Sequence, residues 1–395
     1  MESLKVDIKN KYQCSGCSAC AVKCPKNSIT MCADSMGFLY PQINASTCIN
    51  CGLCLKICPF TTDYSANIEF AKPLVYASRL KDEKELVNSQ SGGLFYALSE
   101  YVLNNGGVVY GAGYTNNFKV QHKRVTTKYD REELRLSKYS QSEIEGIYAL
   151  VKADIVSGKL VLFTGTPCQV AGVKSFIGNL DHNDNFITVD LVCHGVPSPK
   201  IWEDYLQYLG NKYDSKIIGT KFRDKSFGWI SHVETIKLQT DKIINSTTYN
   251  RLYHSHYSIR LSCSKCPYTN LRRVGDITIG DYWGWHEKHS EFNDNLGVSL
   301  VIVSSNKGLS VFKQLQHNII AIETDIEDCL QPQLIAPIQL PDDRSDFEIL
   351  YSQGGFIKAM KKFGFLGLRY RIKLALKFID KYKRGIRLRL NKILK

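Results

Sequence analysis

The sequence predicts a small α+β domain, then a larger α/β domain built on a mixed, largely parallel sheet, and finally an amphipathic helix. Three observations lead to this prediction. Eight of the 14 cysteines fall in two short runs near the N-terminus. Short apolar stretches then alternate with helix-like stretches, and the last 40 residues are strongly basic. We expect domains at residues 1–64 and 73–335, and a basic helical tail at residues 350–395.

The N-terminal cysteines follow the pattern C-x2-C-x2-C-x3-C-P twice, over residues 14–25 and 48–59. This is the ligand spacing of a two-cluster 4Fe–4S ferredoxin, in which the last cysteine of each run binds the other cluster. Zinc knuckles or a disulfide framework are less suitable, because zinc sites pair cysteines two by two and disulfides belong to oxidising compartments. The predicted ligands are a first thiol group, Cys14, Cys17, Cys20 and Cys58, and a second thiol group, Cys24, Cys48, Cys51 and Cys54.

Composition and charge exclude several classes of protein. No run approaches the roughly 18 uninterrupted apolar residues of a membrane span, and the first residues lack the hydrophobic stretch of a signal peptide. We therefore expect a cytoplasmic protein. The net charge of +13 lies in Phe356–Lys395, which holds 14 Lys or Arg and one Asp, and the rest of the chain balances 37 basic with 37 acidic residues. A nucleic-acid partner is not expected, because the body lacks a basic face.

After a connector near residues 63–72, the pattern is that of an α/β domain. Strands are expected at Val75–Arg79, Val108–Tyr114, Lys119–Thr127, Lys159–Phe163, Phe186–Val192, Ile217–Lys221, Val233–Leu238 and Asp276–Gly280. Helices are expected at 91–103, 142–157, 168–177 and Ile201–Leu209. The first helix begins with Ser91-Gly92-Gly93, which either binds a cofactor phosphate through free amides or simply caps the helix.

Four further cysteines lie in the α/β region. Cys168 and Cys193 each follow a predicted strand, where ligands of parallel sheets gather, and Cys263 and Cys266 form a C-x2-C pair before another strand. Four thiols are the number that a third 4Fe–4S cluster requires. Zinc, a redox disulfide and unrelated buried thiols remain open as alternatives. Cys32 and Cys329 lie outside these patterns, and we expect a packed thiol and a structural thiol, respectively.

With these residues in place, the chain resembles the family named for the beta subunit of coenzyme F-420 hydrogenases and dehydrogenases. The resemblance spans roughly residues 73–310 and is carried by Gln90–Gly93, Ser137–Ser142, Gly165–Gln169, Asp190–Pro199, Cys263–Cys266 and Gly275–Gly284. It implies an FAD-binding domain with its own 4Fe–4S cluster, held by a third thiol group of Cys168, Cys193, Cys263 and Cys266. It also implies FAD contacts at Ser91, Gly92, Gly93, Lys138, Tyr139, Thr164, Gly165 and Thr166.

These parts predict an iron–sulfur flavoprotein oxidoreductase. Electrons would pass between a ferredoxin or other redox partner protein, the clusters, FAD and a small-molecule substrate. Similar bacterial proteins resemble products of polysaccharide-biosynthesis loci, which suggests a link to that chemistry. The alternative is a non-catalytic electron-transfer subunit of a larger dehydrogenase or hydrogenase complex. No deazaflavin pocket is recognisable in the sequence.

Several side chains are candidates for the reaction itself. His194 either supplies a proton to the flavin or substrate, or only hydrogen-bonds its loop. Arg272 and Arg273 either clamp an anion or are solvated. The aromatic stretch Asp281–Trp285 either lines the cofactor site or covers the sheet edge.

The C-terminal residues predict an amphipathic cationic helix. Apolar side chains from Leu368 to Ile393 share one helical face, and Lys and Arg side chains oppose it. Such a helix can lie on the anionic inner face of the cell membrane, which would make the protein peripheral there. The alternative is that the apolar face docks on the body.

Overall fold

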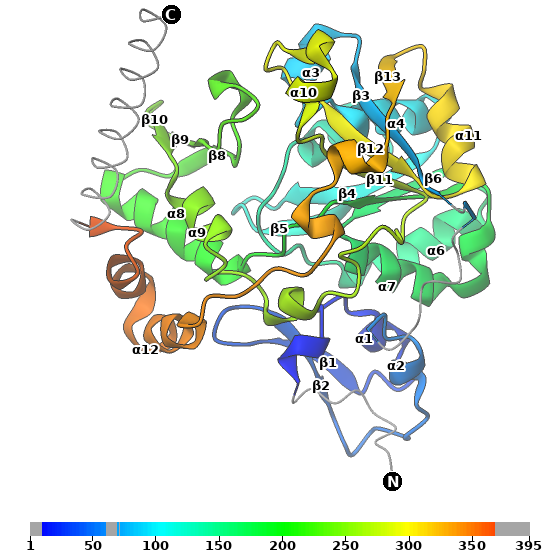
Figure 1. Cartoon of the computed structure of the whole chain (residues 1–395). Helices are drawn as coiled ribbons and strands as arrows, with labels where there is room; N and C mark the ends of the chain where they lie inside the picture. The colour runs from blue at the N-terminus through cyan, green and yellow to red at the C-terminus, as the bar shows by residue number, and fades with distance from the viewer. Residues whose placement is uncertain (1–9, 61–68, 71, 368–395) are drawn as a thin grey trace, which may run out of the picture.

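The computed structural model describes residues 10–60, 69–70 and 72–367. The N-terminal domain consists of an antiparallel pair, β1 (Ile29–Ala33) and β2 (Leu39–Ile43), and two short helices, α1 (Ala19–Lys23) and α2 (Leu53–Lys56) (Figure 1). Each helix follows a residue with left-handed backbone, Ser18 before α1 and Gly52 before α2. These turns bring each cysteine run into a tight loop that leads into its helix.

The body is organised around one eight-stranded mixed sheet, with the strand order β13-β3-β12-β11-β7-β6-β4-β5. The strands β11, β7, β6 and β4 are parallel to one another, and β5, β12 and β13 run in the opposite direction. Their bounds are β3 (Leu74–Leu80), β4 (Val108–Tyr114), β5 (Val120–Val125), β6 (Val161–Gly165), β7 (Phe186–Leu191), β11 (Ile277–Asp281), β12 (Ser299–Val303) and β13 (Ile319–Glu323).

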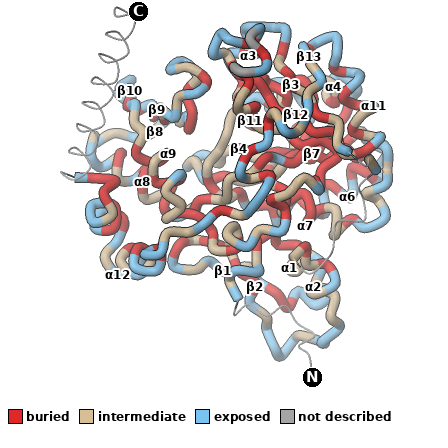
Figure 2. The backbone as a smooth tube through the Cα atoms, in the orientation of Figure 1, coloured by how far each residue is buried: buried red, intermediate tan, exposed pale blue. Residues whose placement is uncertain are grey.

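Helices cover both faces of this sheet. On one face, α4 (Leu94–Asn104) and α11 (Asn306–Gln314) pack on Leu162 and Ile187 of the central strands. On the other, α6 (Tyr148–Val156) and α7 (Pro167–Ile177) pack on Val161, Phe163 and Phe186. Because successive side chains of a strand point to opposite faces, β6 and β7 are apolar almost throughout and are buried, as Figure 2 shows.

A second lobe, on the left in Figure 1, holds a three-stranded antiparallel sheet. Its strands are β8 (Ile217–Lys221), β9 (Glu234–Leu238) and β10 (Ile243–Ser246), and its helices are α8 (Pro199–Tyr213), α9 (Thr248–His254) and α12 (Arg344–Lys362). Met36, Phe38 and Tyr40 of the N-terminal domain enter the hydrophobic core of this lobe. The N-terminal domain therefore packs on both parts of the body, since Cys17, Ala19 and Ile57 join the core under α6 and α7.

Short helices complete the described chain. They are α3 (Glu83–Val87), α5 (Lys128–Arg131), α10 (Trp285–Lys288) and the 3-10 helices at Lys11–Gln13, Glu132–Leu134, Glu145–Ile147, Gly178–His182, Lys225–Phe227, Leu261–Lys265, Ser290–Phe292, Ile326–Cys329 and Pro332–Leu334. No helix in the described ranges is both long enough and apolar enough to cross a bilayer. Part of the predicted tail, up to Leu366, continues α12 and packs into the core of the second lobe, whereas residues 368–395 lie outside the described residues.

The predicted elements agree closely with the observed ones. Two predicted strands, Val108–Tyr114 and Ile217–Lys221, have the bounds of β4 and β8. The helix predicted at 91–103 begins only at Leu94, because Ser91 and Gly93 adopt left-handed backbone at φ 53° and 83°. The helix predicted at 142–157 starts as a 3-10 turn and becomes α-helical at Tyr148.

Candidate functional site

The first thiol group is brought together in the N-terminal domain. Burial, with added repulsion from Cys14 and Cys58, raises the pKa of Cys17 to about 12. Burial also raises the pKa of Cys20, and Cys17, Cys14 and Cys58 add to the effect. The charge of Cys58, the last cysteine of the second run, therefore acts on thiols of the first run. The assignment of Cys58 to the first cluster stays a prediction.

The second thiol group lines one small pocket of the N-terminal domain. Cys24, Cys48, Cys51 and Cys54 all face it, together with Pro25 and Gly52. The amide of Ser28 donates a hydrogen bond to Cys24 Sγ over 3.3 Å. Cys51 is the exposed member of this group. Electrons from a partner protein would therefore have their shortest route through this group.

The third thiol group lies in the body. Burial raises the pKa of Cys193 well above its usual value, and Cys263, Cys168 and Cys266 contribute to that rise. Cys168 lies in the first turn of α7, Cys193 follows β7, and the other two flank the end of the 3-10 helix Leu261–Lys265. The structure thus collects thiols from three separate loops at the carboxyl ends of β6 and β7.

Polar contacts to sulfur support the third thiol group. The amide of Val196 donates to Cys263 Sγ over 3.4 Å, and the hydroxyl of Thr166 lies 3.3 Å from Cys168 Sγ. All 14 cysteines are free thiols. Within the described ranges, no three His, Cys, Asp or Glu side chains are placed to bind a single metal ion. A 4Fe–4S cluster does not require several side chains on one metal ion, since each of its four thiolates binds a different iron.

The first thiol group lies between the other two. The charge of Cys168 contributes to the raised pKa of Cys17, and that of Cys54 contributes to the raised pKa of Cys20. Gly172 of α7 permits the approach, because a Cβ there would lie 3.2 Å from Cys17 Sγ. The three groups therefore form a series, second, first, third, from the exposed N-terminal domain into the body.

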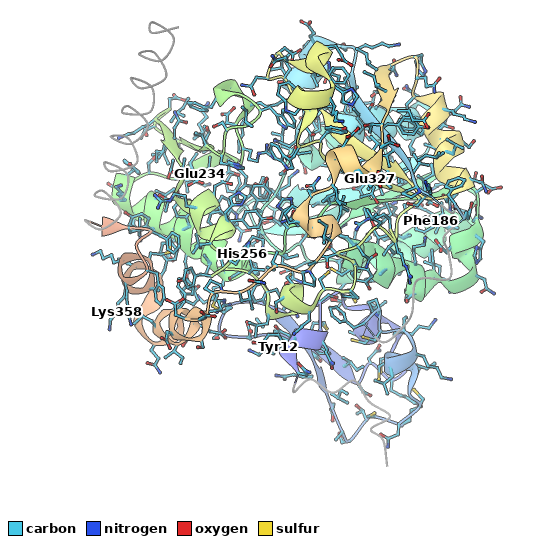
Figure 3. The ribbon with its side chains drawn as sticks, viewed as in Figure 1. Tyr12, Phe186, Glu234, His256, Glu327 and Lys358 are labelled. Carbon is cyan, nitrogen blue, oxygen red and sulfur yellow. The ribbon has the colours of Figure 1, made fainter. Side chains whose placement is uncertain are left out.

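Hydrogen bonds join the N-terminal domain to the body beside this series. Tyr148 Oη donates to the carbonyl of Cys17, and Tyr268 Oη donates to the carbonyl of Pro59 over 2.9 Å. Ser198 Oγ donates to the carbonyl of Met36. Figure 3 shows Tyr12 at the edge of the N-terminal domain that faces the body. These contacts hold the first thiol group at a set position against the third.

The Ser91-Gly92-Gly93 turn packs against the sheet. Ser91 Oγ donates to the carbonyl of Val298 over 2.7 Å, and the amide of Gly92 donates to Ser299 Oγ over 2.9 Å. A Cβ on Gly92 would lie 2.2 Å from the carbonyl oxygen of Ser78, so glycine is required for this close approach. The turn lies next to Asp281, and a hydrogen bond from Ser91 contributes to the lowered pKa of that carboxyl.

Lys138 and Tyr139 point to different surroundings. Lys138 Nζ donates to the carbonyls of Glu133 and Arg135 over 2.8 and 2.6 Å, and burial lowers the pKa of Lys138 to about 7. The ring of Tyr139 stacks on Tyr253, with 4.7 Å between ring centroids. Among the predicted FAD contacts, Ser91 hydrogen-bonds to Asp281, and the charge of Asp281 contributes to the raised pKa of Tyr139. The Lys138 ammonium instead binds its own loop.

Thr164, Gly165 and Thr166 support the loop that carries Cys168. Thr164 Oγ1 donates to the carbonyl of Tyr110 over 3.0 Å. Thr166 caps α7 through a capping box with Gln169. A Cβ on Gly165 would lie 3.3 Å from both Gln169 and His122, so this turn is closely packed. Its visible role is to position the third thiol group.

His122, which supports this loop, gives a prediction about pH. Burial lowers the pKa of His122 from 6.5 to about 4, and its ring nitrogens contact Ser142 Oγ and the carbonyl of Thr164. The unfolded chain takes up this proton below pH 6.5 and the folded chain does not, so stability is lost as the pH falls from 6.5 towards 4. Between pH 6.5 and 5.5 we expect the wild type to lose about 1 kcal/mol relative to His122→Gln. Anaerobic urea unfolding of both proteins measures this difference, and a pH-independent difference would contradict it.

A polar site around Arg223 and Asp281 lies next to the third thiol group. Arg223 NH1 lies 2.5 Å from Asp281 Oδ2, and Trp229 Nε1 donates to Asp281 Oδ1 over 3.0 Å. Burial would raise the pKa of Asp281, but the charge of Arg223 and the hydrogen bond from Trp229 outweigh it and lower the pKa. The ring of Trp283 stacks on Trp229 at 5.3 Å. Two residues of the aromatic stretch Asp281–Trp285, Asp281 and Trp283, thus line the polar site.

His194 lies between this polar site and Cys193. Burial lowers the pKa of His194, the negative charge of Asp281 opposes the change, and the charge of Arg223 adds to it. Burial lowers the pKa of His254 to about 4, with contributions from His232 and His194, and the rings of His232 and His254 lie 4.7 Å apart. Three imidazoles therefore gather beside the Arg223–Asp281 pair.

Tyr253 connects this site with the third thiol group. Burial raises its pKa well above the usual value, and Tyr139, Cys193 and Cys263 all contribute. Sequence reasoning missed Arg223 and Tyr253, because neither belongs to a local motif. Asp281 was named as a candidate for the cofactor site with the aromatic residues that follow it, and it also belongs to the stretch Gly275–Gly284.

Arg273 differs from both of its sequence-based interpretations. Its NH2 lies 3.2 Å from Asp190 Oδ1, and the side chains are 1% and 0% exposed. Arg273 also donates to the carbonyls of Tyr268 and Leu191 over 2.7 and 3.0 Å. Arg273 therefore connects the loop after Cys266 with the end of β7. It is buried and paired with Asp190, so it is neither solvated nor available to bind an external anion. Arg272 is exposed.

The two remaining cysteines stay outside the thiol groups. Cys32 lies in β1 and is partly exposed. Cys329 is 1% exposed and packs in a hydrophobic core with Trp229 and Tyr282.

Comparison with known proteins adds two family matches. Residues 158–328 match the family model for the C terminus of the coenzyme F420 hydrogenase/dehydrogenase beta subunit, and residues 13–62 match a 4Fe–4S dicluster domain. A solved structure of the F420-reducing NiFe hydrogenase complex from Methanosarcina barkeri aligns with a TM-score of 0.44 and 18% identity, over 76% of this chain and 93% of that chain. A comparison with curated proteins gave no match. The chain is thus similar to this family over residues 158–328 and to 4Fe–4S dicluster domains over residues 13–62.

Proposed function

We propose that the chain is an iron–sulfur flavoprotein oxidoreductase, which moves electrons between a redox partner protein and a small organic substrate. The observation that carries this proposal is the series of three thiol groups that ends beside the Arg223–Asp281 site. When bound, 4Fe–4S clusters supply one-electron transfer, and FAD supplies the exchange between one-electron and two-electron chemistry. The residues of this chain hold these groups in order and exclude water around them.

The donor set of each thiol group fits a 4Fe–4S cluster. Each group offers four thiols, and no cluster of His, Cys, Asp or Glu able to hold a single metal ion occurs in the part of the chain that the structure describes. Amide and hydroxyl donors to Cys24, Cys263 and Cys168 favour the thiolate form that iron binds. The proposal therefore assigns a third cluster to Cys168, Cys193, Cys263 and Cys266, in addition to the two of the dicluster domain.

The polar site fits a flavin ring in its chemistry. Arg223 Nε is a buried donor that has no hydrogen-bond acceptor among the described residues. A flavin offers carbonyl oxygens and ring nitrogens to such a donor, and Tyr139 and Trp283 offer flat apolar surface. His194 has a lowered pKa and is neutral near pH 7, so its imidazole can accept a proton and pass it on. We assign Tyr139, Arg223, His194 and Ser91 to this site.

Anaerobic purification followed by iron, sulfide and flavin quantitation tests the proposal. We expect about twelve iron atoms, at about four per cluster, and about one FAD per chain. Arg223→Met should keep the iron and lose most of the FAD, because it removes the buried donor and leaves the thiols in place. Full iron content without flavin in the wild type would contradict the flavoprotein assignment.

A second candidate is an electron-transfer subunit of a larger complex, which the beta-subunit description of the matching family favours. Such a subunit would contain the clusters and would not turn over an organic substrate alone. The link to polysaccharide biosynthesis, the cytoplasmic location and membrane binding by the tail at 350–395 stay predictions from the sequence.

A further inference from the structure

Arg260 connects the first and third thiol groups. Its amide donates to the carbonyl of Val196 over 3.0 Å, and its carbonyl accepts from the amide of Cys263 over 3.1 Å. Its backbone is therefore hydrogen-bonded to the segments that carry the third thiol group. Its side chain reaches the first group, where Nε donates to the carbonyl of Cys14 over 2.8 Å and NH2 lies 3.7 Å from Cys14 Sγ. One residue therefore spans the junction between them.

The charge of Arg260 is buried without a carboxylate partner. The residue is 1% exposed, and its guanidinium lies 4.1 Å from the ring centroid of Tyr40. Its other acceptors are neutral, the carbonyl of Leu39 at 2.8 Å and Gln141 Oε1 at 3.0 Å. No Asp or Glu in the described ranges forms an ion pair with it. Burying an unpaired charge is costly, so a negative partner is expected at this place.

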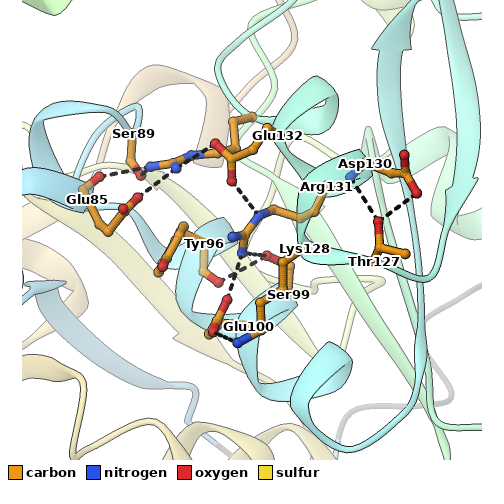
Figure 4. A network of polar contacts seen from close by, with 11 residues as sticks. Glu85, Ser89, Tyr96, Ser99, Glu100, Thr127, Lys128, Asp130, Arg131 and Glu132 are labelled. Atoms are coloured by element: carbon orange, nitrogen blue, oxygen red, sulfur yellow. Dashed lines mark hydrogen bonds and ion pairs between the residues drawn. The ribbon is translucent and has the colours of Figure 1, made fainter.

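Arg131 provides a matched contrast. It is also buried and lies over an aromatic ring, with 4.2 Å to the centroid of Tyr96. However, Arg131 pairs with Glu100 and Glu132 at 3.3 and 2.9 Å, as Figure 4 shows. The fold thus neutralises this buried arginine with carboxylates. At Arg260 the hydrogen-bond partner able to carry negative charge, among the described residues, is the thiol of Cys14, whose Sγ lies 3.7 Å from NH2.

The first thiol group is shaped to admit the guanidinium. Gly16, between Cys14 and Cys17, has φ +69°, and a Cβ there would lie 2.9 Å from Arg260 NH1 and 2.8 Å from Gln141 Nε2. The Gln141 amide also donates to the carbonyl of Ser15 over 3.0 Å. Arg260 and Gln141 together therefore hold the loop that carries Cys14 and Cys17.

We propose that Arg260 is the shared counter-charge of the iron–sulfur clusters bound by the first and third thiol groups, and that it raises the reduction potentials of these two clusters. Reduction adds one electron and breaks no bond, so the bound cluster becomes more negative. A buried positive charge stabilises that reduced state, and burial strengthens the effect. This inference rests on the proposed clusters and is independent of FAD.

The test is an EPR-monitored redox titration of the full chain, purified anaerobically, with Arg260→Met. Methionine keeps much of the apolar volume and removes the charge. In Arg260→Met we expect the reduction potentials of the first and third clusters to fall, with the larger fall at the first cluster. The reduction potential of the second cluster should not change. Arg260→Lys should restore most of the shift because it keeps the charge. Arg131→Met, the matched control, should leave all potentials unchanged.

Unchanged potentials in Arg260→Met, or an equal shift of all clusters, would overturn the proposal. If Arg260→Met fails to retain iron, Arg260→Gln replaces it, since glutamine keeps an amide donor without charge. Wild-type potentials in Arg260→Gln would likewise overturn the proposal. Failure of the proposed function is distinguishable, because it would appear as missing FAD or a missing third cluster, while the first cluster still reports on Arg260.

Discussion

In a Cys266→Ser chain we expect the iron content to fall from about twelve to about eight atoms, at about four per cluster. Cys266 is buried in the body with Cys168, and burial raises its pKa to about 12. A serine hydroxyl ionises far less readily than a thiol and is a poor iron ligand, so the third cluster is lost and the dicluster domain keeps its own. Iron and sulfide quantitation after anaerobic purification measures this change, and EPR of the reduced protein should lose one of three signals.

Cys329→Ser is the matched control for this prediction. Burial also raises the pKa of Cys329 to about 12, but this thiol packs among aromatic residues away from the third group. We expect this variant to keep all of its iron. An iron content of about eight atoms in the wild type, or no loss in Cys266→Ser, would contradict a third cluster.

In an Arg273→Met chain we expect the free energy of unfolding to fall by about 3–5 kcal/mol, the usual cost of breaking a buried ion pair. Asp190 is 0% exposed and accepts hydrogen bonds from the amides of Val274 and Gly275 as well as from Arg273. Without the guanidinium, its charge stays buried and unpaired. Because Arg273 also braces the loop after Cys266, this variant should lose iron from the third thiol group more readily under urea. Anaerobic urea unfolding followed by circular dichroism and by cluster absorbance measures both effects.

Two further variants identify the cause. Arg272→Met removes the neighbouring exposed charge and should change stability by no more than about 0.5 kcal/mol. The double variant Asp190→Asn/Arg273→Met should be more stable than Arg273→Met, because it removes the unpaired charge. Equal destabilisation by Arg272→Met and Arg273→Met would show that the buried pair is not responsible.

The sequence predicted the parts whose information is local. Cysteine spacing identifies the dicluster domain because two-residue gaps and tight turns alone bring three thiols to one cluster. The parallel centre of the sheet was likewise predictable, since β6 and β7 are mostly apolar and are each followed by a loop and a helix. Strands β12 and β13 were missed, although β12 is buried throughout. Their antiparallel places beside β11 and β3 depend on pairing between distant segments.

The candidate site also contains residues that the sequence predicts and residues that only the fold brings together. The cysteines and the strand ends that carry them are readable in the sequence, because a metal ligand must be a particular residue type at a particular spacing. Arg260, Arg223 and Tyr253 carry no such spacing, and their partners lie far away along the chain, such as Cys14 for Arg260 and Asp281 for Arg223. By itself, therefore, the sequence determined the two N-terminal cysteine runs and the alternating α/β elements. Only the tertiary structure decided the order of the thiol groups and the buried charges between them, because both arise from contacts between distant segments of the chain.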